Sequence, residues 1–199
     1  MATATDFVWK EATAEYLAYV FEDENRPAQE AIATRKYWDD ISPQASYWPK
    51  PVDMPPPDVQ SFYGDVYGPG PMVLYLQLEP LIGRPAVLQG IKTFLATAGG
   101  RSVDELKQAL ASASGKNLDA YFDAWVFGQG KPEWPTFDIK TNQVGADVTI
   151  TVTQQNASGK LYGCVVEVEL RGATSSTRAL IDFGVAPSQA SATASATLN

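Results

Sequence analysis

The spacing of apolar residues changes near Trp134 and Pro135, and this change constrains the fold more than any other feature of the sequence. Before this point apolar residues recur every three or four positions, the spacing of helices that bury one face. After it they alternate with polar residues, which is typical of half-buried antiparallel strands. The sequence therefore predicts an α+β protein with a helical domain over residues 1–134 and a small β-sheet or β-sandwich domain over residues 135–199.

Six helices are expected in the first domain, from the positions of caps, prolines and apolar residues. They are predicted near residues 6–22, 27–40, 72–82, 85–98, 102–113 and 117–125. Ser102 and Glu105 have the spacing of a capping box. Residues 42–58 contain six prolines, which excludes regular structure and predicts a long loop.

The first helix has a predicted inward face of residues that recur at three- and four-residue spacing: Phe7, Ala14, Leu17, Ala18 and Phe21. In the second domain, strands are expected where the pattern alternates, near residues 148–152, 164–170 and 179–185. The alanines of residues 190–198 alternate with Ser and Thr, which favours a strand over a frayed linker.

Composition excludes several classes of function. The 199 residues include no histidine and one cysteine, Cys164, so the chain itself offers neither an imidazole metal site nor a Ser–His or Cys–His catalytic pair. Its net charge of -8 argues against binding to nucleic acid, which needs a basic surface. No apolar run approaches the roughly 20 residues that span a bilayer, so no membrane span is expected.

Glu11 is the unusual residue of the first predicted helix. It stands four residues after Phe7 and three before Ala14, on the predicted apolar face. Because a buried carboxylate is costly unless it is paired, protonated or bound to a metal, Glu11 is a candidate ligand or acid/base group. Glu15 adds a second carboxylate one turn later. The alternative is that Glu11 pairs with a Lys or Arg elsewhere in the chain.

Tyr67 precedes a tight turn that Gly68, Pro69 and Gly70 predict, just ahead of an apolar helix. A tyrosine held at such a junction can donate its hydroxyl hydrogen to a developing oxyanion. The alternative is that Tyr67, like Tyr63, packs on the core.

Three stretches resemble the zinc aminopeptidases of the membrane-alanyl aminopeptidase and leukotriene-A4 hydrolase family, within the gluzincin group. The first, Val8-Trp-Lys-Glu11-Ala-Thr-Ala-Glu-Tyr16, is similar to the family's W-L-N-E-G-x-A-x-Y helix. The second, Tyr67-Gly-Pro-Gly70-Pro-Met-Val-Leu-Tyr-Leu, is similar to its Y-x-K-G-x-x-x-L-x-x-L segment. The third includes Leu118-Asp-Ala-Tyr-Phe-Asp-Ala-Trp125 and continues to Gly130-Lys-Pro132, like the turn before the family's β-domain.

The resemblance implies a role for two of these residues. Glu11 stands where the family has the third zinc ligand, and Tyr67 stands where a tyrosine donates a hydrogen bond to the tetrahedral intermediate. Lys10, Ala12 and Pro69 depart from the family's usual Asn, Gly and Lys. The implied fold is the helical half of a gluzincin-like catalytic domain followed by a small antiparallel β domain.

The family's His-Glu-x-x-His helix, which lies roughly twenty residues before the glutamate ligand and supplies two zinc ligands and the general base, has no counterpart in this sequence. We therefore expect the chain to be a C-terminal fragment that is inactive alone. In the full-length parent, zinc would be the cofactor, a peptide cleaved from its amino end the substrate, and the upstream part of the same catalytic domain the partner. The alternative is a non-catalytic protein- or peptide-binding module, such as a degenerate family member that lost its histidines.

Overall fold

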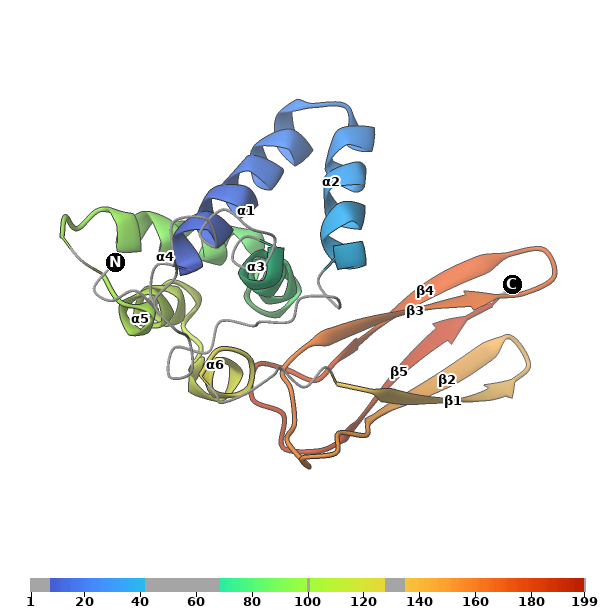
Figure 1. Cartoon of the computed structure of the whole chain (residues 1–199). Coiled ribbons are helices and arrows are strands. Elements are labelled where there is room, and N and C mark those ends of the chain that lie inside the picture. Colours follow the sequence, from blue (N-terminus) through green and yellow to red (C-terminus); the bar gives the residue numbers. More distant parts are fainter. Residues whose placement is uncertain (1–7, 42–68, 100, 128–134, 199) are drawn as a thin grey trace. The chain divides into compact units, whose positions relative to one another are not determined.

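The computed structural model describes residues 8–41, 69–99, 101–127 and 135–198 (Figure 1). The chain divides into two compact units, residues 1–132 and 133–199. The first unit is helical and the second consists of antiparallel strands, so the predicted α+β class is confirmed. The loop predicted over residues 42–58 lies outside the described residues.

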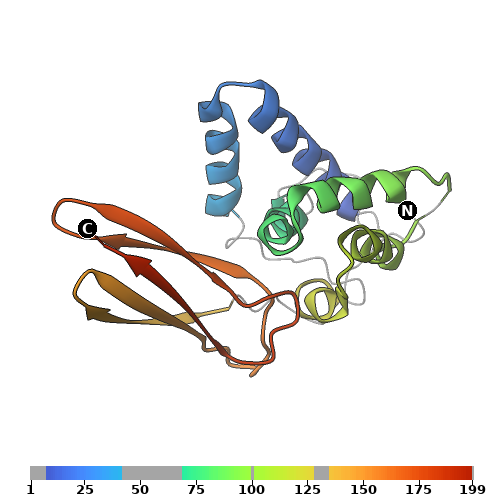
Figure 2. The same ribbon diagram turned by 180° about the vertical axis from the view of Figure 1, so that it is seen from behind.

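Six helices form the described part of the first unit. They are α1 (Val8–Asn25), α2 (Ala28–Ile41), α3 (Pro69–Ile82), α4 (Arg84–Leu95), α5 (Val103–Ser114) and α6 (Asp119–Trp125). Both views show α1 and α2 as a hairpin, with α3 packed against each of them (Figures 1 and 2). In the described residues, no helix is both long and apolar enough to cross a membrane.

Local signals in the sequence set several helix ends. The predicted capping box is present: the Ser102 hydroxyl accepts from the Glu105 amide, and the Glu105 carboxylate accepts from the Ser102 amide at 2.8 Å. Helix α5 then ends at Gly115, whose φ of 67° is left-handed and favours glycine. Helix α4 ends at Leu95, several residues before the predicted stop at residues 99–100.

Helices α4 and α5 pack closely because Gly90 has no side chain. A Cβ at this position would lie 2.8 Å from the Leu110 Cα, a distance that real contacts do not reach. The buried residues of α4 are Val87, Gly90, Ile91 and Phe94. Leu95, the last residue of α4, is exposed.

The predicted inward face of α1 is wrong. Leu17 is 36% exposed and Phe21 is 57% exposed, and Ala14 and Ala18 are exposed too. The buried face consists instead of Ala12, Thr13, Tyr16, Tyr19 and Val20. Both faces have helical spacing, and the face with the larger aromatic side chains is the one that packs on α3.

The described part of the second unit, residues 135–198, contains five strands in two sheets. They are β1 (Phe137–Val144), β2 (Asp147–Gln154), β3 (Val165–Arg171), β4 (Ser176–Asp182) and β5 (Ser191–Thr197). One sheet has the order β1-β2-β5 and the other pairs β3 with β4, all antiparallel. The Ala/Ser/Thr tail does form a strand, with Ala194 opposite Ile150 of β2. Strand β1, which is exposed along nearly its whole length, was not predicted from the sequence.

Alternation decides which side chains the strands bury. On β2, Val148, Ile150 and Val152 enter one apolar cluster with Ala179 and Ile181 of β4 and with Cys164 and Phe183. Their neighbours on β2 are threonines that are more exposed. The period of two therefore predicted this core correctly.

Candidate functional site

Of the two predicted site residues, Glu11 lies within α1 and Tyr67 lies outside the described residues. The structure describes the backbone at Glu11 but not its side chain. Glu11 was expected on the same face of α1 as Ala14, Leu17 and Ala18, and these three residues are exposed. The case for Glu11 as a ligand therefore depends on the resemblance, and the roles of both residues stay predictions.

The contact between α1 and α3 is nevertheless well described further along both helices. Thr13 and Tyr75 share a hydrogen bond between their hydroxyl oxygens at 2.8 Å, in which either can be the donor. The ring of Tyr16 stacks on that of Tyr75, with centroids 5.0 Å apart. Tyr75 has no exposed surface, so this polar contact is sealed within the helical unit.

The order of these contacts fixes the direction of the two helices. Thr13 contacts Tyr75, and Tyr16, three residues later, contacts Glu79, four residues after Tyr75. The contacts advance the same way along both helices, so the N-terminal parts of α1 and α3 lie on the same side of the contact. Glu11 belongs to that part of α1, and α3 begins at Pro69, two residues after Tyr67.

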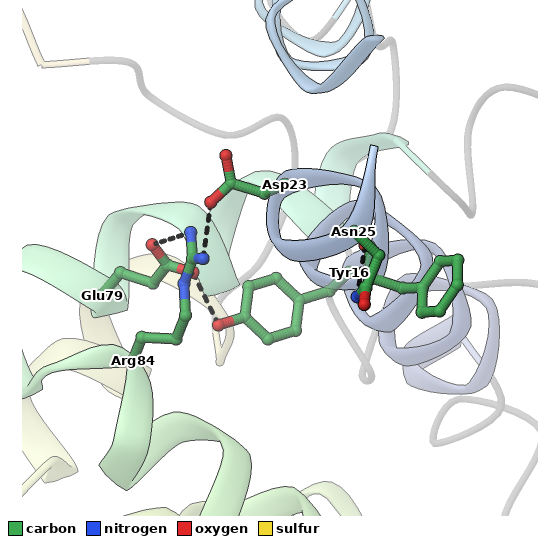
Figure 3. A network of polar contacts seen from close by, with 6 residues as sticks. Tyr16, Asp23, Asn25, Glu79 and Arg84 are labelled. Carbon is green, nitrogen blue, oxygen red and sulfur yellow. Dashed lines mark hydrogen bonds and ion pairs between the residues drawn. The ribbon is translucent and has the colours of Figure 1, made fainter. Parts of the chain in front are cut away.

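A polar network joins α1, α3 and α4 around the carboxylate of Glu79 (Figure 3). Tyr16 donates its hydroxyl hydrogen to Glu79 at 2.8 Å. The Arg84 guanidinium donates to both oxygens of the same carboxylate, at 2.8 and 3.1 Å, which is the bidentate geometry of strong Arg–carboxylate pairs. Arg84 also donates to Asp23 at 2.6 Å and lies over the ring of Tyr19.

The turn between α3 and α4 places Arg84 for these contacts. Pro80 stands within the last turn of α3, and the helix ends at Ile82. Gly83 takes a left-handed φ of 86°, which glycine adopts without strain, and α4 begins with Arg84. At the same corner the Lys116 ammonium donates to the carbonyl of Leu81.

The hydrogen bonds and charges of this network hold the three helices together and do not suit proton transfer. Burial raises the pKa of Tyr16 far above its usual value, and the hydrogen bond to Glu79 raises it further. Burial likewise raises the pKa of Tyr75, and the Glu79 hydrogen bonds hold the pKa of Arg84 above its usual value. Both tyrosines therefore stay protonated at neutral pH, and neither can act as a base.

No group of three or more carboxylate, histidine or cysteine side chains that could hold a metal ion occurs among the described residues. Because the whole chain lacks histidine, its own donors do not suffice for a gluzincin zinc site. Glu11 could be at most one ligand among several. A zinc site of that type that used Glu11 would need donors from outside this sequence.

The network of Tyr16, Glu79 and Arg84 was not predicted from the sequence. Tyr16 is 63 residues from Glu79 in sequence, and the face of α1 that was predicted to point inward does not contain Tyr16. The signal that could have found it is the second apolar face of α1, whose residues 12, 13, 16, 19 and 20 also have helical spacing.

No protein-family profile matches the sequence, and neither does any curated protein. Among solved structures, the chain is similar to aminopeptidase A of Legionella pneumophila, crystallised in complex with aspartic acid. The TM-score is 0.68, the identity is 13%, and the match covers 98% of this chain. The chain spans only 22% of that protein's length. At this identity the match shows a shared fold, in which the helical unit and the β unit occur together.

Proposed function

We propose that this chain is part of a longer zinc-dependent aminopeptidase of the gluzincin type, which hydrolyses peptides from the amino end. The observation that carries the proposal is the fold shared with an aminopeptidase over 98% of the chain. The order of the contacts between α1 and α3 supports it, because they bring the helix of Glu11 and the start of α3 to the same side. In this proposal residues 1–134 form the C-terminal part of the catalytic domain, and residues 135–199 form the β domain.

Two residues of this chain would take part in the reaction. The Glu11 carboxylate would complete the zinc shell, and the Tyr67 hydroxyl would donate a hydrogen bond to the oxyanion of the tetrahedral intermediate. A donor of this kind contributes about 3–4 kcal/mol to transition-state stabilisation. When bound, the metal supplies Lewis-acid polarisation of the peptide carbonyl and activation of water. The remaining ligands and the general base would come from the upstream part of the same catalytic domain.

The chain alone should therefore be inactive. We expect the purified chain to release no product from an aminoacyl-p-nitroanilide, with or without added zinc. The chain extended by its natural upstream coding sequence should hydrolyse this substrate, and a chelator should abolish the activity. Glu11→Gln and Tyr67→Phe in the extended protein should each lower kcat/KM by about 100-fold or more, whereas Glu24→Gln, a change of an exposed carboxylate on the same helix, should not.

Two outcomes would contradict the proposal. Chelator-sensitive turnover by the 199-residue chain alone would show that it needs no upstream donors. An extended protein that folds but neither binds zinc nor hydrolyses the substrate would favour the alternative, a non-catalytic module that binds a protein or peptide. The exposed apolar residues of α1 are compatible with that alternative as well, so the assay and not the fold decides between them.

A further inference from the structure

Strand β1 lies at an open edge of its sheet (Figure 1). In the order β1-β2-β5 it has a hydrogen-bonded neighbour on one side only. The Gln155 amide donates to the Thr136 carbonyl, so the even-numbered residues that follow Thr136 are the ones that bond to β2. The N–H and C=O groups that point away from β2 are therefore those of the odd-numbered residues: Phe137, Ile139, Thr141 and Gln143. Among the described residues, no backbone hydrogen bond reaches this edge.

The devices by which proteins normally protect an open edge are weak in β1. The strand runs for eight residues in unbroken one-to-one register with β2, and it contains neither a proline nor a bulge. Ile139 is 49% exposed and Phe137 is 36% exposed, so apolar surface lies beside the unpaired backbone groups. The edge therefore offers both hydrogen-bonding groups and apolar surface to a further strand.

The charges of β1 make this edge complementary to itself. Asp138 and Lys140 lie on one face of the strand, with 3.3 Å between the carboxylate and the ammonium. If two copies of β1 pair antiparallel about a two-fold axis through Ile139, Asp138 of each copy lies opposite Lys140 of the other. Axes through residue 138 or 140 would place like charges opposite each other, and an axis through Thr141 would pair neither charge with its opposite. An edge lysine normally discourages strand pairing, but in the first register it faces a carboxylate.

We propose that the free edge of β1 is a homodimer interface, at which two copies of the chain join their three-stranded sheets into one six-stranded sheet. The outward backbone groups of Phe137, Ile139 and Thr141 bond to those of Thr141, Ile139 and Phe137 in the second copy. The two Ile139 side chains meet at the axis, so apolar surface that is exposed in the monomer is buried there. The inference is independent of the proposed function, since it uses only the β unit.

Disulfide trapping tests the register of this dimer. Ile139→Cys places two thiols opposite each other at the axis, within the range of a disulfide. Gln143→Cys, on the same edge and the same face, is the matched control, because its two thiols lie eight residues apart along the joined strands, about 27 Å. The native Cys164 gives little background, because it is buried and its burial raises the pKa of its thiol to about 12. We expect covalent dimer to form at least about tenfold faster from Ile139→Cys than from Gln143→Cys.

Exchange of the two charges tests the same pairing without a covalent link. Sedimentation equilibrium of the unmodified chain should show a monomer–dimer equilibrium. Asp138→Lys places lysines opposite each other on both sides of the axis and should raise the dimer Kd about tenfold or more. Adding Lys140→Asp restores both pairs of opposite charge and should return the Kd to within about threefold of its first value. Asp147→Lys makes the same change of net charge at an exposed position of β2 and should leave the Kd unchanged.

Three results would overturn the proposal. The first is a chain that stays monomeric at millimolar concentration, and the second is a Kd that does not respond to the exchange of charges. The third is equally fast trapping at positions 139 and 143, which would show open-ended association of edges instead of a two-fold dimer. Hydrogen exchange of β2 amides checks the fold of each variant, and these amides should stay as protected as in the unmodified chain.

Discussion

The helical unit and the β unit bury their side chains by different means. The core of the β unit is formed by apolar side chains that alternate with polar ones, so each strand offers only one face to bury. Helix α1 has two apolar faces. The buried face is the one whose Thr13 and Tyr16 form hydrogen bonds with α3. Where a segment has one apolar face, its own sequence specifies which face is buried. Where a helix has two apolar faces, contacts with residues distant in the sequence determine which face is buried.

The largest expected effect tests the apolar core of the β unit. Ile150 is fully buried on the central strand β2, so Ile150→Ala should lower the free energy of unfolding by about 2–5 kcal/mol. Hydrogen exchange of β-unit peptides, followed by mass spectrometry, measures this change. The control is Leu180→Ala on β4, where the side chain is 60% exposed and the expected change is within about 0.5 kcal/mol. Similar losses for the two variants would contradict this description of the core.

The next effect tests the polar network of the helical unit. Arg84→Met removes both hydrogen bonds to the Glu79 carboxylate, whose side chain is only 18% exposed. Leaving a carboxylate that is mostly buried with fewer partners should cost about 1–3 kcal/mol, seen as faster exchange of α1 and α3 amides. The control, Asp23→Asn, removes the negative charge of the more exposed partner of Arg84 and should cost at most about 1 kcal/mol. A larger loss for Asp23→Asn would show that Glu79 is not the centre of the network.

A smaller effect concerns a helix end that the sequence did predict. Ser102→Ala removes the acceptor for the Glu105 amide and should lower stability by about 1 kcal/mol. Ser112→Ala, at an exposed position within the same helix, should be neutral or slightly stabilising because alanine favours helices. Urea unfolding of the two variants measures the difference, and equal midpoints would exclude a stabilising capping box.

The smallest effect at neutral pH comes from Cys164. Burial raises the pKa of its thiol from 9.0 to about 12, so the unfolded chain loses this proton at lower pH than the folded chain. The contribution of the buried thiol to the stability of the β unit should therefore be fully present below pH 9. It should be lost as the pH rises from 9 toward 12. Cys164→Ala should reduce this fall, measured as the change in β-unit exchange protection between pH 8 and 10.5. An unchanged slope in the variant would contradict the burial of the thiol.

The secondary structure was largely predictable because its signals are local. Prolines, the capping box and the change of period placed six helices and four of the five strands. Strand β1 was not predicted because residues such as Ile139 and Val144 are exposed. Without a buried face, the strand shows no alternation of apolar and polar residues. The inward face of α1 was not predictable from its own period, since either face satisfied it.

The roles of Glu11 and Tyr67 stay predictions. Helix spacing, a turn signal and a resemblance marked these two residues, and the structure describes neither side chain. The contacts between α1 and α3 depend on pairs such as Thr13 with Tyr75 and Tyr16 with Glu79, which lie more than 60 residues apart. A single sequence carries no signal for pairs at such separation, because only the fold brings them together.

The sequence of the native gene upstream of codon 1 tests the central claim most directly. If the helical unit is part of an aminopeptidase, a His-Glu-x-x-His motif is expected roughly twenty residues before Glu11, on a predicted helix with an apolar face. An upstream reading frame without these histidines, or no upstream reading frame, would contradict the claim. A non-catalytic binding module would then be the better account of the chain.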